Sequence, residues 1–310
     1  MAKKNHNNFS KAATLCALLD KVTMNHTLFK NYLLPLFLCI AVYFPLQAND
    51  HLVLVSVAPY VTMIKELTND QVEVQLLVPA GYSSHTFEPT PRQIIKASSA
   101  RLWFTIGELF EIKAAKALQS ENPKLQTIDL RQGLSLLDDA CHHHGKNHGS
   151  ADPHIWMSPK MMQPQVRLMA KELQKTFPAL SAEIETRLEQ LIVKLQTLDK
   201  KIQEQLVTKR GDTIFVSHPA YGYFCREYDL KQISIEHEGK DHSPKQLTEL
   251  IQLAKELEVK TVFVQKQYST KAAELVAAEV GATTVVLDPY AENYFENMLY
   301  IASAFAKELA

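Results

Sequence analysis

Cysteine is scarce in this chain of 310 residues, which has four: Cys16, Cys39, Cys141 and Cys225. So few cysteines exclude a disulfide scaffold, and the chain is long enough to fold by burying an apolar core. An excess of one charge is also lacking, because 33 basic residues nearly balance 34 acidic ones, with a formal net charge of −1. The composition therefore indicates neither a nucleic acid nor an acidic surface as a partner.

Long hydrophobic runs are lacking as well. The longest run, residues 33–44, is shorter than the roughly 20 residues of a membrane-spanning helix. Lys30 precedes this run and the segment Pro-Leu-Gln-Ala ends at Ala48. A basic segment, a short apolar segment and a small residue at the cleavage site are typical of a secretory signal peptide. We therefore predict a signal peptide in residues 1–48, cleaved near Ala48.

Three alternatives remain for the amino-terminal segment. The apolar run is also compatible with a membrane anchor. Cys39 would be the acylated residue of a lipoprotein, although the bulky Leu38 precedes it where such a site favours a small residue. Met24 is an alternative start of the protein. A twin-arginine pair is lacking, so we expect the general secretion route and a periplasmic protein.

Strand-like and helix-like segments alternate through the rest of the chain. Short apolar runs bounded by turn residues predict strands, and longer amphipathic stretches predict helices. This alternation is typical of βαβ units with a parallel sheet, so we predict an α/β fold. The predicted strands are residues 52–58, 72–78, 102–106, 125–129, 213–217, 232–235, 261–265 and 283–287. The predicted helices cover residues 159–177, 181–210, 269–280 and 294–308. Three more are predicted to begin at Pro59, Pro91 and Pro244.

A single apolar stripe runs along the segment that begins at Ser181. Its members recur every three or four residues, as on one face of a helix: Ile184, Leu188, Leu191, Leu195, Leu198, Ile202 and Leu206. About 27 helical residues span roughly 40 Å, which exceeds the width of a small lobe. We predict a rigid connecting helix in residues 179–210, rather than a coiled coil. It would join lobes at 49–178 and 211–310, with an exposed polar loop at 138–151.

Three histidines beside proline turns are the candidate functional residues: His85, His154 and His218. Proline follows His218 directly, precedes His154 and follows His85 by four residues. Asp288 also precedes a proline, and His218 and Asp288 both follow predicted strands. Open α/β sheets bind ligands at the carboxyl ends of their strands. Three imidazoles and one carboxylate complete a tetrahedral zinc site, so we predict one with two ligands from each side of the connecting helix.

Four segments closely resemble the metal-ligand loops of one family. They are residues 78–91 (Val-Pro-Ala-Gly-Tyr-Ser-Ser-His-Thr-Phe-Glu-Pro-Thr-Pro), 152–159 (Asp-Pro-His-Ile-Trp-Met-Ser-Pro), 217–224 (Ser-His-Pro-Ala-Tyr-Gly-Tyr-Phe) and 287–289 (Leu-Asp-Pro). The family comprises the periplasmic zinc- and manganese-binding solute-binding proteins of metal ABC transporters, of the cluster A-I type. The resemblance covers essentially all of the chain after the signal peptide. It implies two lobes around a rigid helix, with His85, His154, His218 and Asp288 as the metal ligands.

Zinc is the expected metal. Family members tuned to manganese commonly place a glutamate at the third ligand position, where this chain has His218. Imidazole is a softer ligand than carboxylate and suits Zn²⁺, whereas Mn²⁺ prefers oxygen-rich sites. A set of three histidines and one aspartate can still hold manganese or iron, so Mn²⁺ and Fe²⁺ remain alternatives.

A histidine-rich loop supports the choice of zinc, because zinc-specific members of the family carry one at this place. Its histidines are expected to form weak secondary metal sites that capture or sense zinc: His142, His143, His144 and His148. A solvated loop without such a role is the alternative. Cys141 would add a soft ligand or pair with Cys225. Glu88 and Glu236 are candidate carboxylate partners of the metal-binding histidines, and we expect a surface location for His51, His237 and His242.

The resemblance implies an extracytoplasmic receptor, expected to be a monomer, that delivers Zn²⁺ to an inner-membrane ABC permease and its ATPase. Four protein ligands would close the coordination shell, whereas catalytic zinc keeps one position open for water, so we expect no enzymatic activity. A secreted zinc hydrolase, with Asp288 as base, is the rival hypothesis. Against it, the sequence contains no His-Glu-x-x-His motif. An adhesin without a transport role is a third class that remains open.

Overall fold

A computed structural model describes residues 51–138, 151–236 and 243–308. These residues belong to one compact unit that begins at Asn49. The described residues include eight strands: β1 (Leu52–Val55), β2 (Glu73–Leu76), β3 (Leu102–Thr105), β4 (Gln126–Asp129), β5 (Thr213–Val216), β6 (Lys231–Ser234), β7 (Thr261–Gln265) and β8 (Thr283–Leu287). They form two parallel sheets in the orders β2-β1-β3-β4 and β6-β5-β7-β8, which confirms the predicted α/β class.

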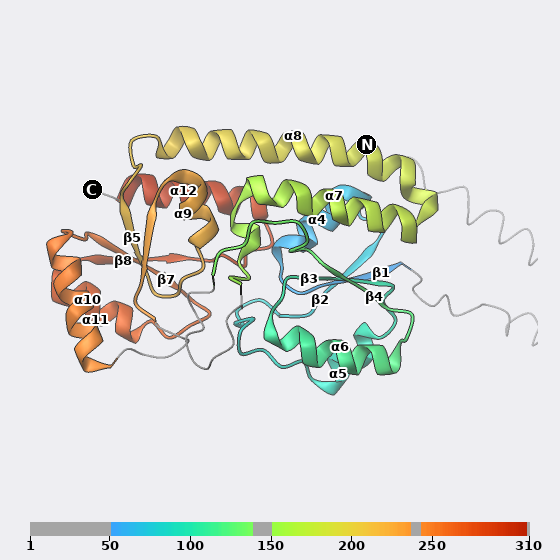
Figure 1. The fold of residues 1–310 in the computed structure, drawn as a ribbon, viewed down its shortest axis with the longest axis horizontal. Helices are drawn as coiled ribbons and strands as arrows, with labels where there is room; N and C mark the ends of the chain where they lie inside the picture. The colour runs from blue at the N-terminus through green and yellow to red at the C-terminus, as the bar shows by residue number, and fades with distance from the viewer. Residues whose placement is uncertain (1–50, 139–150, 237–242, 309–310) are drawn as a thin grey trace, which may run out of the picture. The chain divides into compact units, whose positions relative to one another are not determined.

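Helices cover both faces of each sheet (Figure 1). In the first lobe they are α4 (Pro59–Thr68), α5 (Pro91–Ala97), α6 (Leu109–Glu121) and α7 (Pro159–Thr176), with short 3₁₀ turns η2 (Ile155–Met157) and η3 (Pro178–Leu180). In the second lobe they are α9 (Gly222–Tyr228), α10 (Pro244–Glu256), α11 (Lys271–Val280) and α12 (Tyr294–Glu308). Helices α5 and α6 pack on one side of the first sheet, and α10 and α11 on one side of the second.

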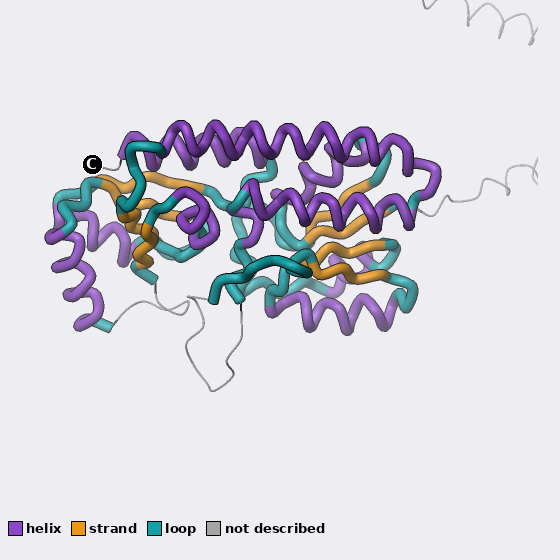
Figure 2. Tube along the Cα trace, turned by 45° about the horizontal axis from the view of Figure 1, so that its top comes forward, coloured by secondary structure: helices purple, strands orange, loops and turns teal. Residues whose placement is uncertain are grey.

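Helix α8 (Ser181–Leu206) has 26 residues and passes along both lobes (Figure 1). It packs against α4 and α7 of the first lobe and against α9 and α12 of the second. All seven residues of the predicted apolar stripe are buried. They join a hydrophobic core that includes residues of both sheets, which confirms the prediction of a connector packed against both lobes. Figure 2 shows the same helix extending beside both groups of strands.

The parallel strands explain where functional side chains collect. Residues of β1 alternate between the two faces of its sheet, so Val53 and Val55 join the core beneath α8 while Leu52 and Leu54 pack towards α5 and α6. With both faces covered, each sheet leaves the loops at its carboxyl edge to form sites. In each sheet the chain also changes the side on which the next strand is added. This change lies between β1 and β3 in the first sheet and between β5 and β7 in the second.

Local sequence signals for the helix starts are confirmed. Thr90 accepts a hydrogen bond from the Gln93 backbone N–H while the Gln93 side chain accepts from the Thr90 N–H. Ser243 and Gln246 form the same capping box at α10. In each case a proline follows the cap, as the sequence predicted, and satisfies the geometry of the first helical turn.

The sequence analysis did not locate α6 and α9. Helix α6 buries a narrow stripe of Phe110, Ala114 and Leu118, while Leu109 and Ile112 on the same helix are exposed. That mixture obscures the helical period that the other helices show. Helix α9 has seven residues, too few to establish a period by pattern.

The signal peptide and the histidine-rich loop lie mostly outside the described residues, as do His237 and His242. In the part of the chain that the structure describes, no helix is long and apolar enough to cross a membrane. The lobe boundaries at residues 49–178 and 211–310 stay predictions.

Candidate metal centre

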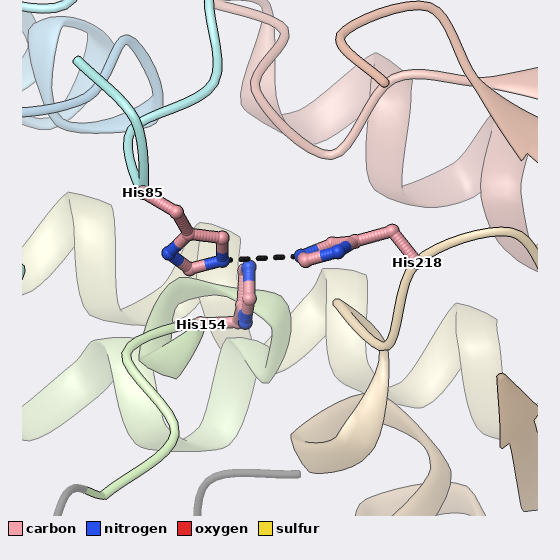
Figure 3. Close-up of side chains that lie close together, drawn as sticks. All are labelled: His85, His154 and His218. Carbon is pink, nitrogen blue, oxygen red and sulfur yellow. Dashed lines mark hydrogen bonds between the residues drawn. The ribbon is translucent and has the colours of Figure 1, made fainter. Parts of the chain in front are cut away.

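Three histidines from distant parts of the chain converge at the carboxyl edges of the two sheets (Figure 3). His85 lies in the loop that follows β2, His154 immediately precedes η2, and His218 follows β5. One nitrogen of each ring lies within 4.8 Å of the others. The Nε2 atoms of His85 and His218 are 3.1 Å apart. Two nitrogens bound tetrahedrally to one zinc at 2.0–2.1 Å are about 3.3 Å apart, so the spacing suits this metal.

Each of these imidazoles is held by a carboxylate at Nδ1. The pairs are His85 with Glu108 at 3.0 Å, His154 with Asp152 at 2.7 Å and His218 with Glu236 at 2.8 Å. A carboxylate at Nδ1 favours the tautomer that carries its proton there, and in this tautomer Nε2 is the nitrogen that can bind a metal. The three imidazoles are thus oriented as a candidate set of metal ligands.

One predicted carboxylate partner is confirmed and the other is wrong. Glu236 binds His218, as expected. Glu88 instead forms an ion pair with Lys113 at 2.6 Å, and its side chain is 72 % exposed. Phe87, the residue before it, is buried and directs the loop so that Glu88 faces solvent. Glu108, which follows β3, takes the place beside His85 and is buried.

Burial adjusts the charge state of the site. His154 and His218 are almost fully buried, and His85 is partly exposed. Burial and the nearby His85 and His154 lower the pKa of His218, which favours its neutral, metal-binding form. Burial by itself would raise the pKa of Glu108, but His85 and the Ser84 hydroxyl hold that pKa below its usual value. The site therefore places a neutral His218 imidazole near an ionised Glu108 carboxylate.

Two glycines allow the carboxylates to reach the histidines. A side chain at Gly222 would place its Cβ 2.9 Å from Asp152 Oδ2, which would displace the partner of His154. Gly107 has a φ of +89°, and a Cβ there would collide with the Arg131 side chain. Glycine accepts this left-handed conformation without strain, so Gly107 lets the chain turn to present the next residue to His85.

Asp288 is not part of the histidine group in the described residues. It follows β8 as predicted, but Lys266 Nζ lies 2.6 Å from its Oδ2 and Gln267 Nε2 donates to its Oδ1 at 2.6 Å. The backbone N–H of Tyr290 also donates to Oδ1, at 3.0 Å. The carboxylate thus lies at the expected edge of the sheet, where three donors already hold it.

Aromatic and hydroxyl side chains enclose the histidines, and the sequence analysis missed them. The Tyr268 ring stacks on His218 with centroids 3.9 Å apart. The Tyr290 hydroxyl lies 3.4 Å from His154 Nε2 and 3.0 Å from the Ser84 hydroxyl. Both tyrosines follow strands of the second sheet, β7 and β8, by a few residues. A search of every loop at the predicted carboxyl edges would have included them.

Other candidate residues fall outside the centre. Cys225 is a buried free thiol, and its predicted pairing or binding partner Cys141 lies outside the described residues. The weak metal-binding histidines 142, 143, 144 and 148 lie outside them too. His51 is exposed, as predicted, and its ring lies 5.2 Å from that of Phe177.

Comparisons with known proteins point to one family. The family model "Zinc-uptake complex component A periplasmic" matches residues 53–308. The high-affinity zinc uptake system protein ZnuA of Bacillus subtilis is 30% identical to the chain over 74% of the chain and 75% of its own length. A crystal structure of ZnuA is 34% identical, with a TM-score of 0.78, and covers 83% of this chain and 98% of that one. A ZnuA deletion mutant with zinc bound is also 34% identical, with a TM-score of 0.76, over 83% and 97%.

Proposed function

Because this chain belongs to the family of periplasmic zinc-uptake components, we propose that it captures Zn²⁺ and delivers it to an ABC permease. The metal is cargo in this proposal, bound between the two lobes. The partners are an inner-membrane permease and its ATPase, and the receptor acts as a periplasmic monomer after cleavage near Ala48. Acylation at Cys39 is the alternative mode of export.

The observation that carries the proposal is the convergence of His85, His154 and His218, each with a carboxylate at Nδ1. We assign these three residues as metal ligands. The carboxylates increase the basicity of the imidazoles and fix the ring orientation, which strengthens their bonds to a metal ion. Such preorganisation lowers the cost of ordering ligands when the metal arrives.

The donor set favours zinc over manganese. Three imidazole nitrogens suit Zn²⁺, and at a nitrogen site the general affinity order also places Zn²⁺ above Mn²⁺ and Fe²⁺. The related ZnuA structure with zinc bound supports the same choice. A manganese or iron receptor is the second candidate within the family.

Asp288 is our candidate for the fourth ligand. To bind a metal, the Asp288 carboxylate would have to give up its contacts with the Lys266 ammonium and the Gln267 amide. A shell closed by Asp288 leaves no position for an activated water, which is why we propose a carrier and not a hydrolase. If the zinc-loaded protein hydrolysed generic esters or peptides and His218→Ala abolished this activity, the rival enzyme would be correct.

Competitive metal binding tests the proposal. The purified protein without residues 1–48 is stripped with a chelator, incubated with equimolar Zn²⁺, Mn²⁺ and Fe²⁺, and assayed by elemental analysis. We expect one tightly bound zinc per chain, lost in His154→Ala. A matched control is His51→Ala, because His51 is exposed and does not belong to the histidine group. Tight binding retained in His154→Ala would disprove the assigned site, and preferential loading of manganese would select the second candidate.

A further inference from the structure

Like Tyr290, the Tyr268 side chain touches both lobes at the centre. Tyr268 follows β7 and belongs to the second lobe, where its ring lies on the His218 imidazole at 3.9 Å with an interplanar angle of 12°. Its hydroxyl accepts a hydrogen bond from Ser83, a buried residue of the first lobe, at 3.1 Å. The Ser83 hydroxyl oxygen in turn accepts from the backbone N–H of His85 at 3.3 Å. A single side chain is therefore connected to two of the three histidines.

The turn that carries Tyr268 is fixed to the site at several points. The Tyr268 N–H donates to the carbonyl of Gln265, which folds the chain back towards His218. Gln265 also donates through its side chain to the His218 carbonyl, at 3.2 Å. The next two residues, Lys266 and Gln267, bind the Asp288 carboxylate. Movement of this turn would consequently alter the surroundings of His218 and Asp288 together.

We propose that Tyr268 is a positioning residue of the metal site, which fixes the separation of His85 and His218 and slows release of the bound metal. This inference rests on the proposed function. The flat contact limits rotation of the His218 ring, whose Nδ1 is already held by Glu236. The bond to Ser83 keeps the His85 loop against the second lobe. For the metal to leave, His85 and His218 must separate, and that motion breaks the contact between Tyr268 and Ser83.

The two contacts can be removed separately. Tyr268→Phe keeps the ring on His218 and removes the hydroxyl, and it leaves the Ser83 hydroxyl without this acceptor. Tyr268→Ala removes both contacts. One net hydrogen bond corresponds to about threefold to tenfold in a rate or equilibrium constant, so we expect zinc release from Tyr268→Phe to be faster by this factor. We expect release from Tyr268→Ala to be faster still.

Zinc release is measured by stopped flow, with the zinc-loaded protein mixed with excess chelator. Ser83→Ala is expected to accelerate release as Tyr268→Phe does. The double variant is expected to be accelerated by less than the product of the two single effects, because both changes remove the contact between Tyr268 and Ser83, although each also removes a contact of its own. Tyr82→Phe is the matched control, since Tyr82 lies in the same loop with 61% of its surface exposed. Its release rate is expected to equal that of the wild type.

A spectroscopic measurement separates positioning from simple loss of stability. With Co²⁺ in place of zinc, the visible absorption of Tyr268→Ala should shift, because the ligand geometry changes, while Tyr82→Phe keeps the wild-type spectrum. The melting temperature of the metal-free Tyr268→Phe is measured in parallel and should stay close to that of the wild type. Equal release rates in wild type, Tyr268→Phe and Tyr268→Ala would overturn the role of Tyr268 while leaving the receptor function intact. If the wild type bound no zinc, or bound it independently of His154, both proposals would fail.

Discussion

Replacing Glu108 by glutamine tests the carboxylate behind His85. The change keeps the shape of the side chain and removes its charge. Glu108 Oε2 lies 3.0 Å from His85 Nδ1, and the side chain is 3% exposed, so solvent screens the pair weakly. Removing a carboxylate partner of a metal-binding histidine typically weakens metal affinity by about 10- to 100-fold, or roughly 1.4–2.7 kcal/mol. Because the amide can still accept from Nδ1, we expect a loss near tenfold for Glu108→Gln.

Glu88→Gln is the matched control, since the sequence places this residue only three positions from His85. Its carboxylate pairs with Lys113 in solvent and does not contact the histidines. The zinc dissociation constant of each stripped protein is measured by competition with a chromophoric chelator at constant pH. Thermal unfolding of the metal-free variants shows whether the fold is intact. A loss of zinc affinity in Glu88→Gln, with none in Glu108→Gln, would refute the assignment of Glu108.

Three further predictions concern the connecting helix, a buried carboxyl and the fourth ligand. Leu195→Ala removes a fully buried side chain of α8 and should lower the free energy of unfolding in urea by about 2–5 kcal/mol, while Val193→Ala, at a position 60% exposed, should change it by less than about 0.5 kcal/mol. Comparable losses in both would contradict the packing of α8. Burial raises the pKa of Glu111 from its usual value near 4.5 to about 7 in the folded protein. At pH values between these two, the folded protein keeps a proton on Glu111 that the unfolded chain releases, so its stability falls as the pH rises. The metal-free wild type should therefore lose stability relative to Glu111→Gln as pH rises from 5 to 8, by at most about 3 kcal/mol, and a constant difference across that range would disprove the shift. Asp288→Asn should weaken zinc binding less than His154→Ala does, and a loss as large as that of His154→Ala, measured by chelator competition, would contradict this ranking.

The sequence predicted those parts of the fold that depend on local chemistry. A capping side chain followed by a proline marks the start of a helix through contacts within one turn. Both examples, Thr90 and Ser243, form capping boxes. The stripe of α8 was equally clear, because seven core positions follow one helical face. Strand ends were predicted within a few residues, since buried parallel strands are short apolar runs. Helices α6 and α9 lacked either signal.

The site could be predicted only to the level of the loops that form it. His85, His154 and His218 were found because each lies in a distinctive proline turn. Their carboxylate partners depend on which loops meet at the edge of the sheet. Glu108 follows β3, whereas His85 follows β2, and these strands are separated by β1 in the sheet. Proximity in sequence favoured Glu88, but proximity in space, set by the sheet, selects Glu108.

The carboxylates behind the histidines also change the expected role of Asp288. Glu108, Asp152 and Glu236 lie against the three imidazoles, so negative charge already surrounds the place where a divalent cation would bind. The Asp288 carboxylate has an ammonium partner of its own in Lys266, at 2.6 Å. A metal ion that binds Asp288 must displace the Lys266 ammonium. The net binding energy from Asp288 is therefore only the difference between the attraction of the carboxylate to the metal and its attraction to the lysine. By contrast, the contacts at the Nε2 atoms of the histidines join neutral groups, such as the Tyr290 hydroxyl 3.4 Å from His154, and no ammonium has to be displaced there. From this asymmetry we expect the three histidines to supply most of the affinity for the metal and Asp288 to adjust it.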